Sequence, residues 1–295
     1  MQKILDKKKI GITVLAFNRP SHLQRLLISL QNSGIKKISL YLDKPNNKIS
    51  EINQKEIIRM IDAAKFWLNS DINKNKKHLG VSKSVKRALD KEFTKFDKII
   101  FLEDDCVPFK FFFDFTIKCL EQFKNNNEVM SVCGYQMPFI KKKSKVITNY
   151  FLRRFMPWGW ATWKNRWKKY NSNLSDIKKE FIRSKNKFYI PDEIKKYLKN
   201  KKLLNNSQDV WSINWSLIHY LNNSFCVYPN ISLIRNIGFD GSGIHCNSSN
   251  AFTVINYEKA IERVKIKNKV IEDKKLDVKI EKYLAKNFPN TIFKK

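Results

Sequence analysis

Short apolar runs alternate with amphipathic segments along the first hundred residues of the chain. The runs have the length of buried strands and lie at 11–17, 37–42 and 98–103, with a weaker one near 71–75. Between them, Leu, Ile and Val recur every three or four residues, which predicts helices that begin near Ser21, Ser50 and Gly80. Strands that alternate with helices predict a parallel sheet with right-handed crossovers. We therefore expect an α/β fold.

The second half of the chain has a less regular pattern. Its apolar content predicts a helix over about 109–123 and strands at 129–133, 224–228 and 231–237. A Gly-rich loop follows these strands at 238–245. Three further elements are expected: Lys-rich helices over 175–203, an amphipathic helix within 207–222 that follows a polar loop, and a charged C-terminal helical extension.

The net charge of the chain suggests classes of partner but does not change the expected fold. The chain of 295 residues has 58 Lys and Arg against 27 Asp and Glu, a net charge of +31. Such a field attracts polyanions: nucleic acid, anionic lipid or phosphorylated substrates. The excess is mostly Lys in a chain rich in Asn and Ile, which is also a pattern of AT-rich codon usage. Charge alone therefore does not define a function here.

The expected location is the cytoplasm. The apolar run that follows the polar start is too short for a secretory signal, and no stretch has the roughly 20 apolar residues of a membrane span. The five cysteines contain no C-x-x-C pair, and their odd number fits a reducing compartment. A basic face could still hold the protein on the inner face of an anionic cell membrane.

Three adjacent acids carry the most specific candidate chemistry. The apolar run at 99–102 leads straight into Glu103, Asp104 and Asp105. Ligands of open α/β sheets bind at the carboxyl ends of the strands. Adjacent carboxylates repel one another unless a cation compensates them, and Mg²⁺ and Mn²⁺ take oxygen ligands. The triplet indicates a divalent-metal site that holds a diphosphate, with a solvated strand end as the alternative.

Several motifs follow one another in a familiar order: Asn18-Arg19-Pro20, Asp43, Glu103-Asp104-Asp105, Pro157-Trp-Gly-Trp160, Asp209-x-Trp211 and the Gly-rich loop. This order resembles the GT-A fold glycosyltransferases, which use a nucleotide sugar and a divalent metal. Within that class it is similar to the N-acetylglucosaminyltransferase I type and to bacterial glycan-assembly transferases with a Trp-Gly-Trp-Ala-Thr-Trp stretch. Neither G-x-G-x-x-G nor a P-loop occurs, which argues against NAD and P-loop ATP binding.

The resemblance implies a Rossmann-like, mostly parallel central sheet flanked by helices. The glycosyltransferase domain would cover residues 1–250, with a nucleotide-binding half at about 10–108 and an acceptor half at about 109–250. A charged extension would cover 251–295.

The same resemblance assigns the nucleotide contacts. Asn18 and Arg19 would meet the base and phosphates, and the planar guanidinium of an arginine suits a diphosphate. Asp43 would accept a hydrogen bond from a uracil N–H or a ribose hydroxyl, with a turn-forming Asp as the alternative. A third contact loop, for which a plain helix start is the alternative, would use His78, Gly80 and Ser82.

The acid triplet is similar to the D-x-D motif of this class. Glu103 stands in the first place of the motif, which puts direct metal ligation by this residue in doubt, and we place it with the nucleotide contacts. Asp105 is the expected metal ligand, and Asp104 would face the ribose or the sugar. His245 would complete the coordination of Mn²⁺ or Mg²⁺ or touch a phosphate, unless it is an ordinary core or surface histidine.

Asp209 is the expected general base. In inverting members of this fold, one carboxylate at a helix entrance deprotonates the acceptor hydroxyl as it attacks the anomeric carbon. The alternative is that Asp209 only caps the helix that carries Trp211.

Tryptophans are concentrated in one short stretch. Trp158 and Trp160 flank Gly159, and in a loop their flat rings would stack on the acceptor sugar. Trp163 and Trp167 stand one helical turn apart, so we expect them in the core on a helix.

Taken together, these expectations describe a glycosyltransferase that moves a hexosyl or N-acetylhexosaminyl group with inversion. The expected donor is a UDP-linked sugar, and the expected acceptor is a cell-surface or lipid-linked glycan. A sugar-1-phosphate nucleotidyltransferase is one alternative, but residues 10–25 contain only one glycine. A basic nucleic-acid-binding protein is the other. Its recognition modules are absent from the sequence and its Lys residues are dispersed, so we expect no nucleic acid partner.

Overall fold

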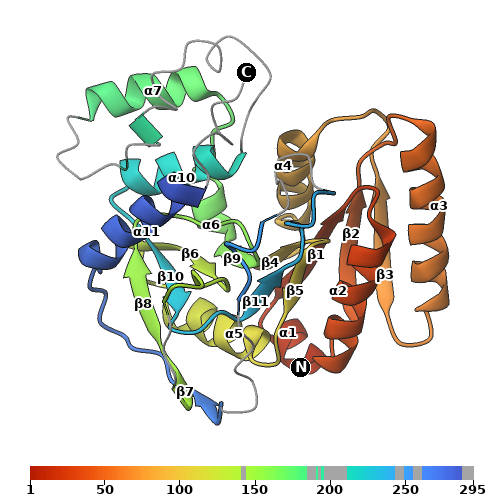
Figure 1. Cartoon of the computed structure of the whole chain (residues 1–295), viewed down its shortest axis with the longest axis horizontal. Helices are drawn as coiled ribbons and strands as arrows, with labels where there is room; N and C mark the ends of the chain where they lie inside the picture. Colours follow the sequence, from red (N-terminus) through yellow and green to blue (C-terminus); the bar gives the residue numbers. More distant parts are fainter. Residues whose placement is uncertain are drawn as a thin grey trace.

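The computed structural model of the chain describes residues 1–140, 144–184, 191, 194–195, 211–242, 249–254 and 261–287. A twisted central sheet runs through the molecule and is flanked by helices (Figure 1). In the spatial order of the sheet, its strands are β3 (Asn69–Lys74), β2 (Lys37–Leu42), β1 (Ile10–Ala16), β4 (Lys98–Glu103), β9 (Trp160–Trp163), β6 (Val129–Cys133), β10 (Phe225–Pro229) and β8 (Asn149–Leu152).

The sheet is mostly parallel, as predicted. Strand β1 pairs in parallel with β2 and β4, and β2 pairs in parallel with β3. Strand β10 is parallel to β6, whereas β9 runs antiparallel between β4 and β6, and β8 is antiparallel to β10. Outside this sheet, two short ladders join β5 (Cys106–Pro108) to β11 (Ile234–Asn236) and β7 (Val146–Ile147) to β12 (Arg263–Val264).

Helices connect the parallel strands and cover the sheet. Those of the first half are α1 (Gln2–Lys7), α2 (Pro20–Asn32), α3 (Lys48–Ala63), α4 (Val81–Glu92) and α5 (Phe112–Gln122). Those of the second half are α6 (Lys164–Trp167), α7 (Leu174–Arg183), α10 (Trp211–Leu221) and α11 (Lys274–Asn287). Among the helices the structure describes, none combines the length and the apolar character needed to cross a bilayer.

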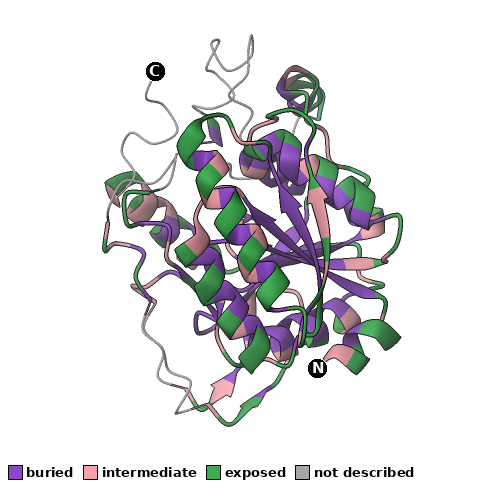
Figure 2. Cartoon of the chain, turned by 90° about the vertical axis from the view of Figure 1, so that its right-hand side faces the viewer, coloured by how far each residue is buried: buried purple, intermediate pink, exposed green. Residues whose placement is uncertain are grey.

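Apolar strands explain why the sheet forms the core. All seven residues of β1 are buried, and so are the last five of β2. Figure 2 shows these strands enclosed, with helices that bury one face and expose the other. Strand β3 is polar because it lies at the edge of the sheet, where it pairs only with β2. The continuous apolar runs in the sequence therefore indicate which strands lie in the interior of the sheet.

The tryptophan-rich stretch differs from the prediction of a loop followed by a helix with both Trp163 and Trp167. Trp160 and Trp163 are the two ends of β9, and Trp167 ends the short helix α6. All four residues of β9 are buried, since the strand lies between β4 and β6. An enclosed strand is normally marked by a continuous apolar run, but β9 has only four residues and one of them is Thr162, so its sequence gives no strand signal.

The predicted C-terminal helical extension is confirmed in α11. Two ion pairs attach this end of the chain to the segment after β8. Arg154 Nε lies 3.2 Å from Asp277 Oδ1, and Arg153 Nε lies 3.1 Å from Glu272 Oε1. All four side chains are largely buried, so the extension packs closely against the sheet domain.

Candidate functional site

The carboxyl ends of three neighbouring parallel strands bring the predicted nucleotide residues to one edge of the sheet. Asn18 and Arg19 follow β1, Asp43 follows β2, and the acid triplet begins at the last residue of β4. The backbone N–H of Asp104 donates to the carbonyl of Leu15 in β1 at 3.0 Å, which holds the two strand ends together. The carbonyl of Asn18 accepts a hydrogen bond from a side chain of α3.

Arg19 bridges two members of the acid triplet. One of its terminal nitrogens donates to Oδ1 of Asp104 and, at 2.8 Å, to Oδ2 of Asp105. Arg19 is the residue that precedes α2, and Pro20 opens that helix, so the backbone fixes where the side chain starts. Asp104 and Asp105 are 3% and 8% exposed, so this is a nearly buried cluster of opposite charges.

Burial strongly affects ionisation in the triplet. It raises the pKa of Glu103 well above its usual range, and the charges of Asp105 and Asp104 act in the same direction. Burial also raises the pKa of Asp104, to about 6, although Arg19 opposes the change. The pKa of Arg19 is raised in turn, because the two carboxylates outweigh the effect of its own burial. Even when Glu103 is protonated, one guanidinium faces the two carboxylates of Asp104 and Asp105, so the cluster favours a second cation.

A loop of the second half closes over Asp105. The N–H of Ile237 donates to the carbonyl of Asp105 at 2.9 Å, and the N–H of Gly238 donates to Oδ1 of Asn236 at 2.8 Å. A Cβ added to Gly238 would lie only 2.3 Å from Oδ2 of Asp105. The start of the predicted Gly-rich loop therefore touches the acids, and a side chain at position 238 would displace Asp105.

His22 holds the same loop from the opposite side. It is a buried residue of α2, and its Nε2 lies 3.3 Å from the carbonyl of Ile237 and 3.2 Å from Oδ2 of Asp240. Burial lowers the pKa of His22, and the charge of Arg19 adds to this effect, although the charge of Asp240 opposes it. Sequence reasoning missed both His22 and its contact with Asp240, because a single histidine within an amphipathic helix carries no signal.

Asp43 organises the loop that precedes α4. Its carboxylate accepts hydrogen bonds from the backbone N–H groups of Lys44 (2.9 Å), Leu79 (2.9 Å) and Gly80 (2.8 Å), and from Nδ2 of Asn75 (2.8 Å). The side chain is 6% exposed. These donors occupy most of the lone pairs of both oxygens, so the carboxylate fixes the backbone of the loop.

Replacing Asp43 by Asn should lower the free energy of unfolding by about 2 kcal/mol, because an amide nitrogen would then face the N–H donors of Leu79 and Gly80. Urea unfolding measures this loss. Asp71→Asn is the matched control, since Asp71 is exposed at the sheet edge, where it pairs with Lys95. An Asp43→Asn variant as stable as the control would show that the network does not hold the loop.

The predicted base-contact loop lies beside two other elements. The imidazole of His78 lies 5.5 Å, centroid to centroid, from the ring of Phe17 at the end of β1. Gly80 has φ +77°, a conformation that side chains rarely adopt, and it leads directly into α4. The Oγ of Ser82 accepts the N–H of Trp211 at 3.1 Å, so α10 starts next to the start of α4.

Of the acceptor candidates, Trp158 lies beside the loop over the acids. Its ring stands edge-on to Phe239, at 5.3 Å between centroids, and to Tyr135, at 4.6 Å. It is partly exposed. Gly159 has φ +62°, and a Cβ there would lie 2.4 Å from the side chain of Ile234, so the position needs glycine.

Trp160 lies in the interior. It is 0% exposed and packs among the rings of Phe101, Phe155 and Trp211, with centroids 5.9, 4.9 and 5.5 Å away. A sugar needs an open ring face for stacking, and this side chain has none in the structure. Its contribution is to the packing between β4 and α10.

Two predicted residues, Asp209 and His245, lie outside the described residues. Within the described part, no three His, Cys, Asp or Glu side chains converge as a complete metal site. Asp104 and Asp105 nevertheless share a cation in Arg19. Their oxygens fit Mg²⁺ or Mn²⁺, which proteins commonly bind through one or two carboxylates together with substrate phosphates and water.

No family model matches the chain, and no curated protein matches it. Similar solved structures include S. aureus TarS residues 1–349 (13% identity, TM-score 0.44, covering 75% of this chain and 57% of that one). A second is the mannosyltransferase PcManGT from Pyrobaculum calidifontis in complex with GDP-Man and Mn²⁺ (10%, 0.40, 55% and 46%).

A third similar structure is 4-diphosphocytidyl-2C-methyl-D-erythritol synthase from Anaerococcus prevotii (12% identity, TM-score 0.36, covering 68% of this chain and 87% of that one). The chain spans only about half the length of the first two. These values are too low to assign the chain to a family.

Proposed function

We propose that this protein is a metal-dependent glycosyltransferase of the GT-A type that transfers a sugar from a nucleotide-sugar donor to a glycan. The observation that carries this proposal is the buried cluster in which Arg19 bridges Asp104 and Asp105 under the loop at 236–242. The cluster lies at the carboxyl ends of parallel strands, where open α/β sheets bind ligands. It joins a fork of donors suited to a diphosphate with carboxylates suited to a divalent cation.

Asp105, assisted by Asp104, would hold Mn²⁺ or Mg²⁺, and His245 would complete the ligand set. The bound ion would act as a Lewis acid that stabilises the charge developing on the leaving diphosphate. Arg19 would then exchange one of its carboxylate contacts for the phosphates. Glu103 would not bind the ion, and by taking up or losing a proton it would change the net charge of the acid cluster. Gly238 keeps the space beside Asp105 free of side-chain atoms.

The nucleoside would lie toward the ends of β1 and β2, where Asn18, His78, Gly80 and Ser82 are the proposed contacts for base and ribose. Asp43 holds this loop in shape through its backbone contacts. The ring pair of Phe17 and His78 supports a stacking position there. UDP is the proposed nucleotide.

The acceptor would approach from the second half of the chain. Trp158 and Gly159 support an acceptor position next to Phe239, while Trp160 would shape that position from within. Asp209, two residues before Trp211, is the proposed general base, and in that role it would give inversion. The proposed acceptor is a cell-surface glycan assembled in the cytoplasm at an anionic membrane. The domain would be residues 1–250, followed by the charged extension at 251–295.

The test is release of nucleoside diphosphate from a panel of UDP-, GDP-, CMP- and dTDP-sugars, with MnCl₂ or with a chelator. Many transferases hydrolyse their donor slowly without an acceptor, so the assay needs no acceptor. We expect metal-dependent release from one donor, most strongly from a UDP-sugar. Incorporation of a nucleoside monophosphate into a sugar phosphate, with no release from any donor, would instead identify a nucleotidyltransferase.

A further inference from the structure

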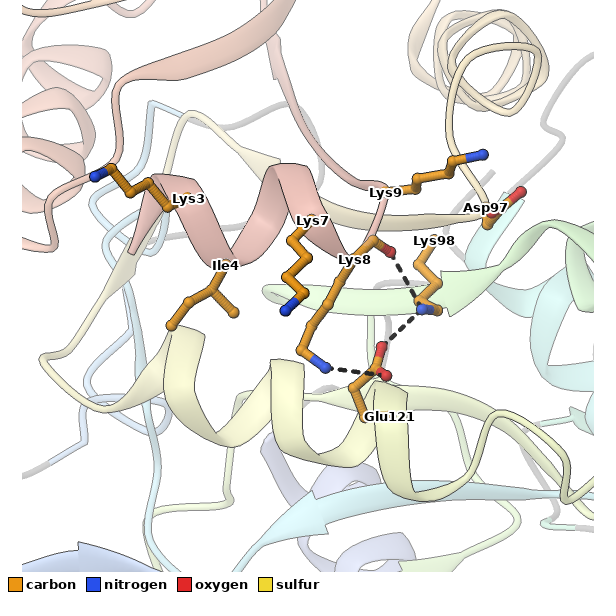
Figure 3. Close-up of a pocket in the computed structure, with 8 residues that line it drawn as sticks. All are labelled: Lys3, Ile4, Lys7, Lys8, Lys9, Asp97, Lys98 and Glu121. Atoms are coloured by element: carbon orange, nitrogen blue, oxygen red, sulfur yellow. Dashed lines mark hydrogen bonds and ion pairs between the residues drawn. The ribbon is translucent and has the colours of Figure 1, made fainter.

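A second charged recess lies at the opposite end of the sheet from the acids. It has a volume of about 740 Å³ and opens between α1, the start of β4 and the outer face of α5 (Figure 3). It is lined by Lys3, Ile4, Lys7, Lys8, Lys9, Asp97, Lys98 and Glu121. Because the acids follow the last residue of β4 and Lys98 is its first, the two sites are about 20 Å apart.

The ion pairs in this recess use only part of its positive charge. Glu121 binds two lysines, with Lys98 Nζ at 2.7 Å and Lys8 Nζ at 3.1 Å, and Lys98 also donates to the carbonyl of Lys8 at 3.2 Å. These bonds lower the pKa of Glu121 despite its partial burial. The Glu121 carboxylate is therefore occupied, and it fixes the floor of the recess.

Three further lysines surround this floor. Lys3, Lys7 and Lys9 are exposed, and among the described residues no carboxylate lies within ion-pair distance of their ammonium groups. Figure 3 shows Lys7 directed toward the floor, with Lys3 and Lys9 at the two ends of the α1 segment. Lys3 and Lys9 extend away from each other in this view, so the positive charge is spread over the mouth of the recess, as suits a surface with many phosphates.

Apolar side chains lie next to these lysines on α1. Ile4 of α1 is 47% exposed, and Met1, which caps the helix, is 38% exposed. Leu5, by contrast, is buried. An exposed face that combines lysines with an isoleucine and a methionine is typical of a surface that lies in the headgroup region of a bilayer. A soluble anion would use the lysines but would gain nothing from Ile4.

We propose that the surface around the mouth of this recess, formed by Lys3, Ile4 and Lys7 of α1 and by Lys9 just after it, docks on the surface of a membrane that contains anionic lipids. The lysines bind lipid phosphates, and Ile4 enters the interface. In this orientation the strands of the first half point away from the bilayer and hold the acid cluster about 20 Å from it. The docking surface is independent of the proposed enzyme activity, since no residue is shared between the two sites.

The test is co-sedimentation of the whole protein with vesicles of phosphatidylcholine alone or with about 30% phosphatidylglycerol, at about 0.1 M salt. The wild type should bind the mixed vesicles selectively. Replacing Lys3, Lys7 and Lys9 together by Gln should weaken this binding about 100-fold, the loss expected for three lysines at an anionic surface. Ile4→Gln should weaken it about fivefold.

The matched control replaces three exposed lysines of α11, Lys274, Lys275 and Lys279, and removes the same charge. It should bind as the wild type does. Equal loss in both triple variants would mean that binding follows net charge and would overturn the docking surface. Equal binding to both vesicle types would overturn it as well. Stabilisation by pyrophosphate that needs the α1 lysines, without selective vesicle binding, would assign the recess to soluble anions instead.

Discussion

Replacing Asp105 by Asn is expected to lower metal-dependent release of nucleoside diphosphate about 1,000-fold, a loss of about 4 kcal/mol in transition-state stabilisation. An amide keeps the size of the side chain but provides one neutral oxygen where the carboxylate offers two charged ones. The pair of Arg19 with Asp104 remains, so the fold should persist. The measurement is donor turnover against MnCl₂ concentration, for wild type and variant side by side.

Asp62→Asn is the matched control for this variant. Asp62 is an exposed residue near the end of α3, where it pairs with Lys65 at 2.8 Å, so its replacement should leave turnover unchanged. Urea unfolding of Asp105→Asn would establish that the variant is folded. A folded Asp105→Asn protein with wild-type turnover and unchanged metal dependence would exclude this carboxylate as the metal ligand.

Replacing Arg19 by Gln is expected to lower the free energy of unfolding by about 3 kcal/mol at pH 8, because it leaves Asp104 and Asp105 nearly buried without their cation. The loss should be smaller at pH 5. With Arg19 present, burial already raises the pKa of Asp104 to about 6. Arg19 opposes this rise, so its loss raises the pKa further, and keeping Asp104 ionised at pH 8 costs the variant more than binding a proton at pH 5. Urea unfolding at the two pH values measures both effects.

Mn²⁺ should restore more stability to the Arg19→Gln variant than to the wild type, since the ion can then occupy the position of the guanidinium. Arg25→Gln is the matched control, on the exposed face of the same helix, and should change stability by less than about 0.5 kcal/mol. An Arg19→Gln variant that loses stability but gains none from Mn²⁺ would show that the acid pair is only a structural ion pair.

Much of the first half could be predicted from the sequence, because apolar runs and helical periods mark its elements directly. The strands at 11–17, 37–42 and 98–103 match β1, β2 and β4 closely, and even the weak run near 71–75 overlaps β3. Strand β9 was not predictable. Its identity depends on pairing with β4 and β6, which lie far from it along the chain, and its Trp-Ala-Thr-Trp sequence has no periodicity of its own.

The candidate site was likewise predictable from the sequence only in part. Arg19, Asp43 and the acids each follow a predictable strand, so their gathering at one sheet edge follows from topology. The contacts of His22 with the loop at 237–240 arise only when the two halves of the chain pack together, and no local pattern encodes them. The burial of Trp160 has the same origin, since a loop and a central strand cannot be told apart from four residues.

Electron paramagnetic resonance of Mn²⁺ titrated with the protein, alone and with UDP, tests the central claim most directly. The claim is that Asp104 and Asp105 form a metal site completed by a nucleoside diphosphate. We expect weak binding of Mn²⁺ alone and at least tenfold tighter binding with UDP, and we expect Asp105→Asn to abolish both. Free Mn²⁺ throughout the titration, with or without UDP, would contradict the claim and leave Arg19 and its two acids as a structural ion pair.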